Sequence, residues 1–255
     1  MQVSLRDLIK DGENLPSKPL ILFKLVNALR DPGISLEDIA GIIEGDSALC
    51  SRLLKMVNSP FYGFPSAVET IEHALSIIGS VPVLDMELTT VVRDKFKGIP
   101  KSFINMDLFW QHSIACGLVA RNLARQKNES NVNRFYVIGL LHDIGRLLIY
   151  MKVPELAREA LAVCKSTGRY LFDVEQDIFG FTHATLGGEL LKSWDLPKSL
   201  VDAVSYHHKP FDAKHHHLET AIVHVANFIT NSMQIGGSGD FFVPPLDGNA
   251  WEKLG

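Results

Sequence analysis

The 255-residue sequence has few cysteines and no long apolar run, and both shortages limit what the protein can be. Its three cysteines are an odd number at wide spacings, which does not suit a disulfide framework and favours a reducing compartment. The start, from Met1 to Asp11, lacks the apolar core of a secretory signal. The most apolar stretch, residues 135–151, contains His142, Asp143 and Arg146, so no membrane-spanning helix is expected. These absences predict a cytoplasmic protein.

An excess of positive charge is missing as well. The chain has 25 basic and 29 acidic residues, which give a net charge of −4. Proteins that bind nucleic acid neutralise phosphates with clustered lysine and arginine, so no nucleic-acid partner is expected. Residues 36–57 superficially suggest a helix-turn-helix reader, but its second helix offers only Arg52 and Lys55 as cations.

Alternation of apolar and polar residues with a period of two is almost absent, and helix signals are frequent. The sequence therefore predicts an all-α fold. In the first hundred residues, Pro19 opens a helix with Leu22 and Val26 on one face. Ser35 followed by Asp38 resembles a capping box, and Asp46 is placed to cap the next helix.

Gly98, Ile99 and Pro100 form the clearest domain boundary in the chain. The boundary predicts an N-terminal helical subdomain over residues 1–100, a helical core over 101–235 and an irregular C-terminal tail over 236–255, in which Gly236–Gly239 is a flexible turn. Longer amphipathic patterns predict the core helices at roughly 107–126, 132–151, 154–167, 171–179, 182–194, 197–207 and 217–231.

Four of the core helices carry histidine where the pattern calls for an apolar residue. A hydrogen-bonded core histidine is the ordinary explanation for any one of them. Together they are harder to explain, because every buried ring nitrogen needs a partner and leaving one unpaired costs about 1–3 kcal/mol. A bound cation would take one nitrogen from each ring. The pattern therefore predicts a metal site made from His112, His142, Asp143, His183, His207 and His208.

The remaining histidines indicate ordinary roles. His73 and His224 have no carboxylate or second histidine nearby in sequence, so both are interpreted as structural. His215, His216 and His217 follow Pro210 and Asp212 and are interpreted as part of a solvated loop.

The order of these residues resembles a known family. His112, the run His142-Asp143-Ile144-Gly145-Arg146, His183 and His207-His208 together look like the HD superfamily of metal-dependent phosphohydrolases. The front half resembles the HDOD domain, the HD-related output domain of bacterial signalling proteins. It does so through Leu15-Pro16, Asp46-Ser47-Ala48-Leu49, Asn58-Ser59-Pro60-Phe61-Tyr62-Gly63, Ala74 and Ile78-Gly79. The likeness runs from about Leu15 to the tail and implies a multi-helix HD-like bundle.

The resemblance also implies a metal chemistry, with three departures. Catalytic relatives such as the HD-GYP cyclic-di-GMP phosphodiesterases hold two or three metal ions on the matching positions. Here Leu108 stands where HD-GYP enzymes have Glu, Asn227 stands where HD enzymes have Asp, and Lys209-Pro210-Phe211 replaces the GYP segment. Two divalent ions would be undercompensated by Asp143 alone. One transition metal ion (iron, zinc, manganese or nickel) or an empty site is therefore expected.

Two functions follow from the resemblance. The first is a signal-transduction output module with a non-catalytic core, which receives its input from a signalling protein partner or a small nucleotide ligand. The second is a metal-dependent phosphohydrolase acting on a nucleotide or cyclic dinucleotide. In that case Arg146, which stands where related phosphodiesterases have a phosphate-binding Lys, would hold the phosphate. The other interpretation of Arg146 is a solvated or salt-bridged residue at a helix surface.

Overall fold

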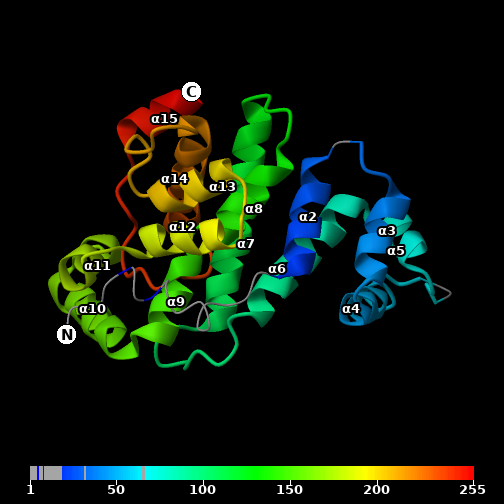
Figure 1. Cartoon of the computed structure of the whole chain (residues 1–255), viewed down its shortest axis with the longest axis horizontal. Helices are drawn as coiled ribbons and strands as arrows, with labels where there is room; N and C mark the ends of the chain where they lie inside the picture. The colour runs from blue at the N-terminus through cyan, green and yellow to red at the C-terminus, as the bar shows by residue number, and fades with distance from the viewer. Residues whose placement is uncertain (1–4, 6–7, 9–18, 32, 65–66) are drawn as a thin grey trace. The chain divides into compact units, whose positions relative to one another are not determined.

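The computed structural model describes residues 5, 8, 19–31, 33–64 and 67–255 (Figure 1). These residues form helices and no strand, which confirms the predicted all-α class; Leu15-Pro16 lies outside them. No described helix is both long and apolar enough to cross a membrane, and α5 with α6 reaches that composition only as a pair bent by 112°. The helices are α2 (Leu20–Arg30), α3 (Leu36–Glu44), α4 (Ser47–Val57), α5 (Ile71–Ile78), α6 (Ser80–Asp94), α7 (Met106–Gln126), α8 (Asn133–Leu141), α9 (Ile144–Lys152), α10 (Pro154–Thr167), α11 (Leu171–Phe179), α12 (His183–Ser193), α13 (Lys198–Tyr206), α14 (His217–Ser232) and α15 (Gly248–Leu254).

The helices α2 to α6 belong to one compact unit, Pro19–Asp94. The helix-capping residues of this unit act as the sequence predicts. Ser35 and Asp38 form a reciprocal capping box at the start of α3, and Asp46 accepts hydrogen bonds from the first backbone amides of α4. The core of this unit is aliphatic and closed to solvent, formed by residues such as Leu25, Ile43, Leu53, Leu75 and Leu88.

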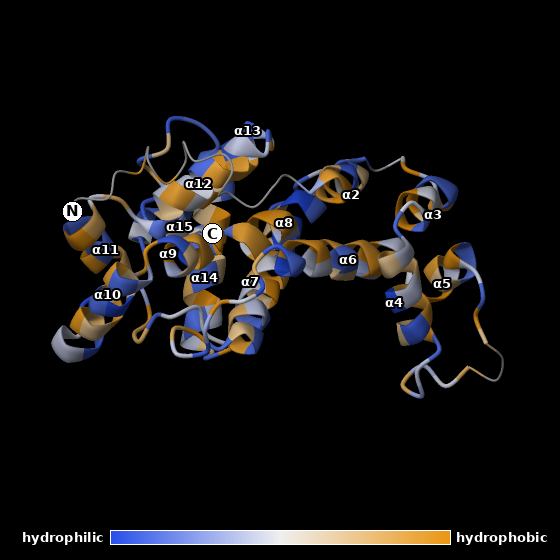
Figure 2. Ribbon diagram, turned by 60° about the horizontal axis from the view of Figure 1, so that its bottom comes forward, coloured by the Kyte–Doolittle hydropathy of each residue, from blue (hydrophilic) through white to orange (hydrophobic). Residues whose placement is uncertain are grey.

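The helices α7 to α15 belong to a second compact unit that includes Lys95–Gly255. The long helix α7 packs against α8 and α14, while α12 packs against α9 and α13 (Figure 1). The helices α10 and α11 pack against each other, and each contains both hydrophilic and hydrophobic residues (Figure 2). Most residues of α8 and α9 are buried, on all sides of each helix, so these two helices form the centre of this unit.

The single helix predicted over residues 132–151 is wrong. The structure has two helices there, separated by a turn at His142 and Asp143, two of the predicted metal ligands. The His142 ring Nδ1 donates to the carbonyl oxygen of Gly139 at 2.7 Å. That carbonyl would otherwise accept the next amide of the helix ladder, so the ring ends α8. The following helix begins afresh, with the Arg146 amide bonded to the Asp143 carbonyl at 2.9 Å.

The predicted irregular tail is also wrong over its last residues, which form α15. Asp247 caps this helix by accepting from the amides of Asn249 and Ala250. His224 in α14 accepts from the Asp247 amide at 2.8 Å and donates to the His207 carbonyl at 2.7 Å. His224 therefore ties α15 to the end of α13, in agreement with its interpretation as structural.

Glu87 in α6 is a buried acid without a hydrogen-bond partner. Its side chain is fully buried, and neither carboxylate oxygen is hydrogen-bonded. Burial raises the pKa of Glu87 to about 7, a rise that Arg52 opposes and Asp46 supports. The folded state therefore holds this proton more tightly than the unfolded state, whose carboxyl has its usual lower pKa.

Glu87 should make the stability of the protein depend on pH. Because the folded pKa is raised, the stabilisation is present below the unfolded pKa and is lost as the pH rises through about 7. We expect the free energy of unfolding to fall by about 2–3 kcal/mol between pH 5 and pH 8 through this residue. In denaturant unfolding, the free energy of Glu87→Gln should lack this fall with pH. The free energy of Glu72→Gln, a change at an exposed position of α5, should keep it. A slope that is unchanged in Glu87→Gln would contradict this account.

Candidate metal centre

The six predicted ligand residues meet at one place in the second unit. His112 lies in α7, His142 and Asp143 in the turn between α8 and α9, His183 at the start of α12, and His207 and His208 just after α13. Neighbouring rings lie with their centroids 5.3 Å apart for His112 and His142, 5.1 Å for His142 and His207, and 4.1 Å for His207 and His208. Segments separated by up to 96 residues in sequence therefore contribute to a single cluster, which we call the histidine cluster.

The tautomers of two rings follow from their outer hydrogen bonds. His142 donates from Nδ1 to the Gly139 carbonyl at 2.7 Å, and His207 donates from Nδ1 to the Val204 carbonyl at 2.8 Å. When either ring is neutral, its lone pair is therefore on Nε2. Both Nε2 atoms are buried, face Asp143 and lack a hydrogen-bond partner. This is the arrangement in which outer acceptors orient a metal-binding imidazole.

Asp143 completes a set of orphaned atoms that fits a metal ion. Its Oδ2 is also buried without a hydrogen-bond partner and lies 3.2 Å from His142 Nε2, while its Oδ1 lies 3.7 Å from His207 Nε2. Ligand atoms around a tetrahedral ion with bonds near 2.1 Å lie about 3.4 Å apart. His142, Asp143 and His207 therefore have the lone pairs and unmet bonding of metal ligands. The ligand atoms that lie within 4.8 Å of one another form two groups that share Asp143, one with His112 and His142 and the other with His183, His207 and His208.

His112 is the least suited of the predicted ligands. Its Nε2 donates to Asn227 Oδ1 at 3.0 Å, and Asn227 Oδ1 also accepts from Asn231 at 2.7 Å. The ring nitrogen nearest Asp143 therefore carries a proton, at 3.9 Å from Oδ2. The amide that replaces the acid of HD enzymes thus turns His112 away from metal binding and into a hydrogen bond.

His183 and His208 form the other side of the cluster. His183 donates from Nδ1 to Glu175 in α11 at 2.6 Å, and the same carboxylate accepts the His183 backbone amide at 2.8 Å. The Nε2 of His183 is 3.0 Å from His208 Nε2 and 3.2 Å from Asp143 Oδ1. Glu175 was not predicted, although its place in the apolar stripe with Leu171 and Val174 was a usable signal.

Arg146 does not lie at a helix surface; it is fully buried inside the cluster. Its Nε donates to Asp143 Oδ1 at 3.1 Å and its Nη2 to Asp240 Oδ2 at 2.7 Å. Nη2 also lies 3.4 Å from His183 Nε2, and Nη1 donates to the Ser238 carbonyl at 3.3 Å. Arg146 is therefore salt-bridged, as one interpretation of the sequence held, but it is buried and does not lie at a helix surface. The guanidinium nitrogens of Arg146 therefore already donate to protein groups, and none of these hydrogen bonds is left for a phosphate.

The segment that supplies Asp240 is Gly236–Asp240, which we call the glycine strap. The sequence predicts a flexible turn here, but Ser238 is fully buried and the Gly237 amide donates to the Leu108 carbonyl at 3.0 Å. A Cβ on Gly236 would collide with the backbone of α7 at Leu108 and His112, and its φ is +68°. Glycine is needed at this position for both reasons, and it lets the strap lie directly on the helix that carries His112.

The histidines of the cluster differ in protonation. Burial disfavours the charged form of His142, but Asp143 outweighs it and holds the pKa of His142 well above that of a free imidazole. Burial and Arg146 disfavour the charged form of His183, but Glu175 and Asp143 outweigh them, so the pKa of His183 is raised as well.

Burial disfavours the charged form of Asp143, but Arg146 and His142 outweigh it and hold the pKa of Asp143 well below its usual range. Burial, with His142 adding to it, lowers the pKa of His207 far below that of a free imidazole. Burial lowers the pKa of His112 to about 4. Asp143 is therefore a carboxylate and His207 an uncharged imidazole at neutral pH, the protonation states that metal binding requires, whereas His142 has to release a proton when it binds an ion.

The remaining histidines lie outside the cluster. His73 is exposed, and His216 pairs with Asp202 at a distance of 2.8 Å. A pocket beside the cluster is lined by Tyr170, Phe172, Asp173, His208, Lys209, Asp240, Pro244 and Pro245. It reaches His208 and the Asp240 end of the strap, but His142, Asp143 and His207 are not part of its lining.

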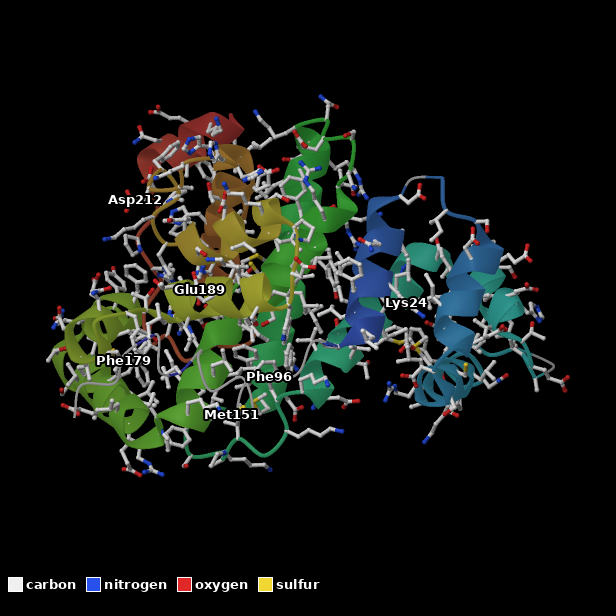
Figure 3. The ribbon with its side chains drawn as sticks, viewed as in Figure 1. Lys24, Phe96, Met151, Phe179, Glu189 and Asp212 are labelled. Atoms are coloured by element: carbon white, nitrogen blue, oxygen red, sulfur yellow. The ribbon has the colours of Figure 1, made fainter. Side chains whose placement is uncertain are left out.

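The crossing of α9 and α12 brings Asp143 and His183 together. In Figure 3, Met151 marks the end of α9 and Glu189 marks α12. A Cβ on Gly145 would lie 2.7 Å from the Gly187 amide nitrogen and closer still to the carbonyl oxygen of His183. The two backbones therefore touch at a position two residues after Asp143, which glycine alone permits.

Comparison with known proteins agrees with this architecture. The sequence matches the family described as the HDOD domain over residues 15–210. A Geobacter sulfurreducens HDOD domain protein of unknown function is similar in structure, with a TM-score of 0.80 and 23% identity over 97% of this chain and 86% of that one. A Shewanella amazonensis protein provisionally named a phosphohydrolase has a TM-score of 0.72 and 20% identity over 97% and 92% of the two chains. At sequence identities of 23% and 20%, these similarities establish the shared fold alone.

Two further relatives are longer than this chain. A Marinobacter aquaeolei protein provisionally named a signal transduction protein has a TM-score of 0.78 and 19% identity, and the match covers 100% of this chain but 56% of that one. An uncharacterized protein of Treponema pallidum is 26% identical over 211 residues, which is 82% of this chain and 40% of the relative. The chain thus spans less than half of that curated relative.

Gly145→Ala should disrupt the centre by separating α9 from α12. The added methyl group meets backbone atoms that cannot rotate away, so we expect the free energy of unfolding to fall by about 2 kcal/mol or more. Gly248→Ala is a control in the same unit, because no described atom lies within 4 Å of the new Cβ. We expect the control to be neutral or slightly stabilising, by up to about 1 kcal/mol. Equal stability of the two variants in denaturant titrations would show that the α9–α12 contact is not as close as described.

Proposed function

The chain belongs to the HDOD domain family, and on that basis we propose that it is a bacterial signal-transduction output module. In this proposal the HD-like core binds one metal ion as a structural element and catalyses no reaction. The three free cysteines suit the cytoplasmic location that the sequence predicts.

The closure of the histidine cluster is the observation that carries the proposal. His112, His142, Asp143, His183 and His207 are each 0% exposed, and so is Arg146. A phosphodiester substrate and its attacking water must both reach the metal ligands for hydrolysis to occur. Since the ligand atoms are enclosed and the strap covers Arg146, the arrangement favours a structural site over a catalytic one.

Charge balance supports one ion rather than two. The cluster holds the carboxylates of Asp143, Glu175 and Asp240 and the guanidinium of Arg146. One divalent ion together with Arg146 would balance these three carboxylates. Two divalent ions would leave two positive charges uncompensated in a buried site, which is costly. His142, Asp143 and His207 would hold the ion, and such an ion supplies a Lewis acid and a cross-link between helices.

The output then depends on contacts made elsewhere on the protein. Phe61 is 88% exposed on the first unit, with Tyr62 beside it in an edge-to-face contact at 5.1 Å and Phe64 stacked on Tyr62 at 6.3 Å. Clustered exposed aromatic side chains are typical of protein-binding surfaces. We propose a signalling protein as the partner, with a small nucleotide ligand as the alternative input.

The second candidate function is a metal-dependent phosphohydrolase. His208 favours it, because this residue is half-buried and lines the pocket beside the cluster. A nucleotide in that pocket would have to displace Asp240 from Arg146 to approach Asp143. The provisional name of the Shewanella amazonensis protein refers to that protein, and the fold alone is shared at 20% identity.

The two functions differ in metal content and turnover. The purified 255-residue chain, loaded with Zn²⁺ and dialysed, should retain about one ion, held by His142, Asp143 and His207. His207→Gln should weaken zinc binding at least about tenfold, because it removes one ligand nitrogen without changing charge. His73→Gln changes an exposed histidine and should leave zinc binding unaltered.

The same preparations, reconstituted with zinc, manganese or iron, should not hydrolyse cyclic dinucleotides or nucleotides. Sustained turnover that is abolished by Asp143→Ala would overturn the non-catalytic proposal in favour of the phosphohydrolase. Absence of bound metal from the wild-type protein would instead remove the metal from the proposal and leave the signalling role in place.

A further inference from the structure

We infer that Arg146 serves as a built-in second cation, which excludes a second metal ion from the histidine cluster and fastens the glycine strap over it. The inference deepens the proposed function and rests on the one-ion site described above. It concerns the side of the cluster formed by Asp143 Oδ1, His183 and His208.

The position of the guanidinium is the first part of the argument. Asp143 Oδ1 and the Nε2 atoms of His183, His207 and His208 lie close enough together to hold an ion. Arg146 already donates to this oxygen at 3.1 Å and lies 3.4 Å from His183 Nε2. A divalent ion here would face the full positive charge of a buried arginine a few ångströms away. The repulsion is strong next to a buried charge, and Asp143 Oδ1 and the Nε2 atoms of His183 and His208 already have partners.

The pairing of the two carboxylates is the second part. Asp143 presents one oxygen to Arg146 and leaves the other, Oδ2, unbonded beside His142. Asp240 binds the opposite end of the same guanidinium at 2.7 Å. Arg146 therefore bridges two acids in the way that a metal ion bridges carboxylates, while the orphaned Nε2 of His142 lies beside Oδ2, the oxygen of Asp143 that Arg146 does not bind.

The strap supplies the third part. Three of its residues contact the cluster or its helix: Gly237 bonds Leu108, Ser238 accepts from Arg146, and Asp240 pairs with Arg146. Directly after Asp240 come Phe241 and Phe242, which are 50% and 45% exposed. Loss of the Arg146–Asp240 pair should therefore free a segment that ends in exposed aromatic residues.

Metal stoichiometry tests the first half of the inference. The 255-residue chain is saturated with Mn²⁺, passed through a desalting column, and measured by elemental analysis and electron paramagnetic resonance. Arg146→Met should hold one ion more than the wild type, and the signal should change from that of an isolated ion to that of an exchange-coupled pair. Arg146→Lys keeps a cation and should behave as the wild type. Arg169→Met removes an exposed arginine paired with Asp177 and is the matched control.

Limited proteolysis tests the second half. Chymotrypsin should cut after Phe241 or Phe242 at least about tenfold faster in Arg146→Met and in Asp240→Asn than in the wild type or Arg169→Met. Circular dichroism confirms that each variant retains its helices. If Arg146→Met does not fold, Asp240→Asn still decides, because it loosens the strap and leaves the guanidinium in place.

The outcomes separate this inference from the proposed function. Equal manganese content in the wild type and Arg146→Met, or two ions in the wild type, would overturn the cation role. Equal cleavage of Asp240→Asn and the wild type would overturn the strap. A wild type without metal contradicts the proposed one-ion site, but the gain of an ion in Arg146→Met would still support the role of Arg146.

Discussion

The structure of the second unit depends on balancing charge in a space that is closed to water. Three carboxylates and five imidazoles meet between helices that are otherwise apolar, and a buried carboxylate without a counter-charge is too costly to keep. Arg146 answers part of this demand by binding Asp143 and Asp240. The part that remains is local: three ligand atoms without a hydrogen-bond partner, on His142, Asp143 and His207, lie at the Asp143 carboxylate. A single divalent ion, as proposed above, would satisfy all three.

The same demand links parts of the chain that are far apart in sequence. The cluster takes residues from α7, the α8–α9 turn, α12 and the end of α13, and Glu175 in α11 fixes the ring of His183. The chain after α14 returns to close the cluster through Asp240, and His224 holds the backbone of His207 to Asp247. Residues that follow α14 thus enclose the histidine cluster, an arrangement that agrees with the proposed non-catalytic role.

Much of this was predictable from the sequence, and the exceptions have physical reasons. Histidines in the apolar stripes of four helices predicted which rings would be buried, because helical periodicity is a local property. The break at His142 escaped prediction because it depends on a ring capturing the carbonyl of Gly139. Glu175 had a local signal in its stripe and was overlooked. Asp240 had none, because it lies outside any periodic element and its partner Arg146 is 94 residues earlier. The interpretation of Gly236–Gly239 as a flexible turn failed for the same reason, since close packing on α7 also requires glycine.

Anomalous diffraction from crystals of the full chain grown with Zn²⁺, measured on both sides of the zinc edge, tests the central claim most directly. The account predicts one strong peak, bounded by His142 Nε2, Asp143 Oδ2 and His207 Nε2, with Arg146 still bonded to Asp240. Two peaks flanking Asp143, with Arg146 displaced, would contradict it, as would a single peak at His215–His217 with the cluster devoid of zinc.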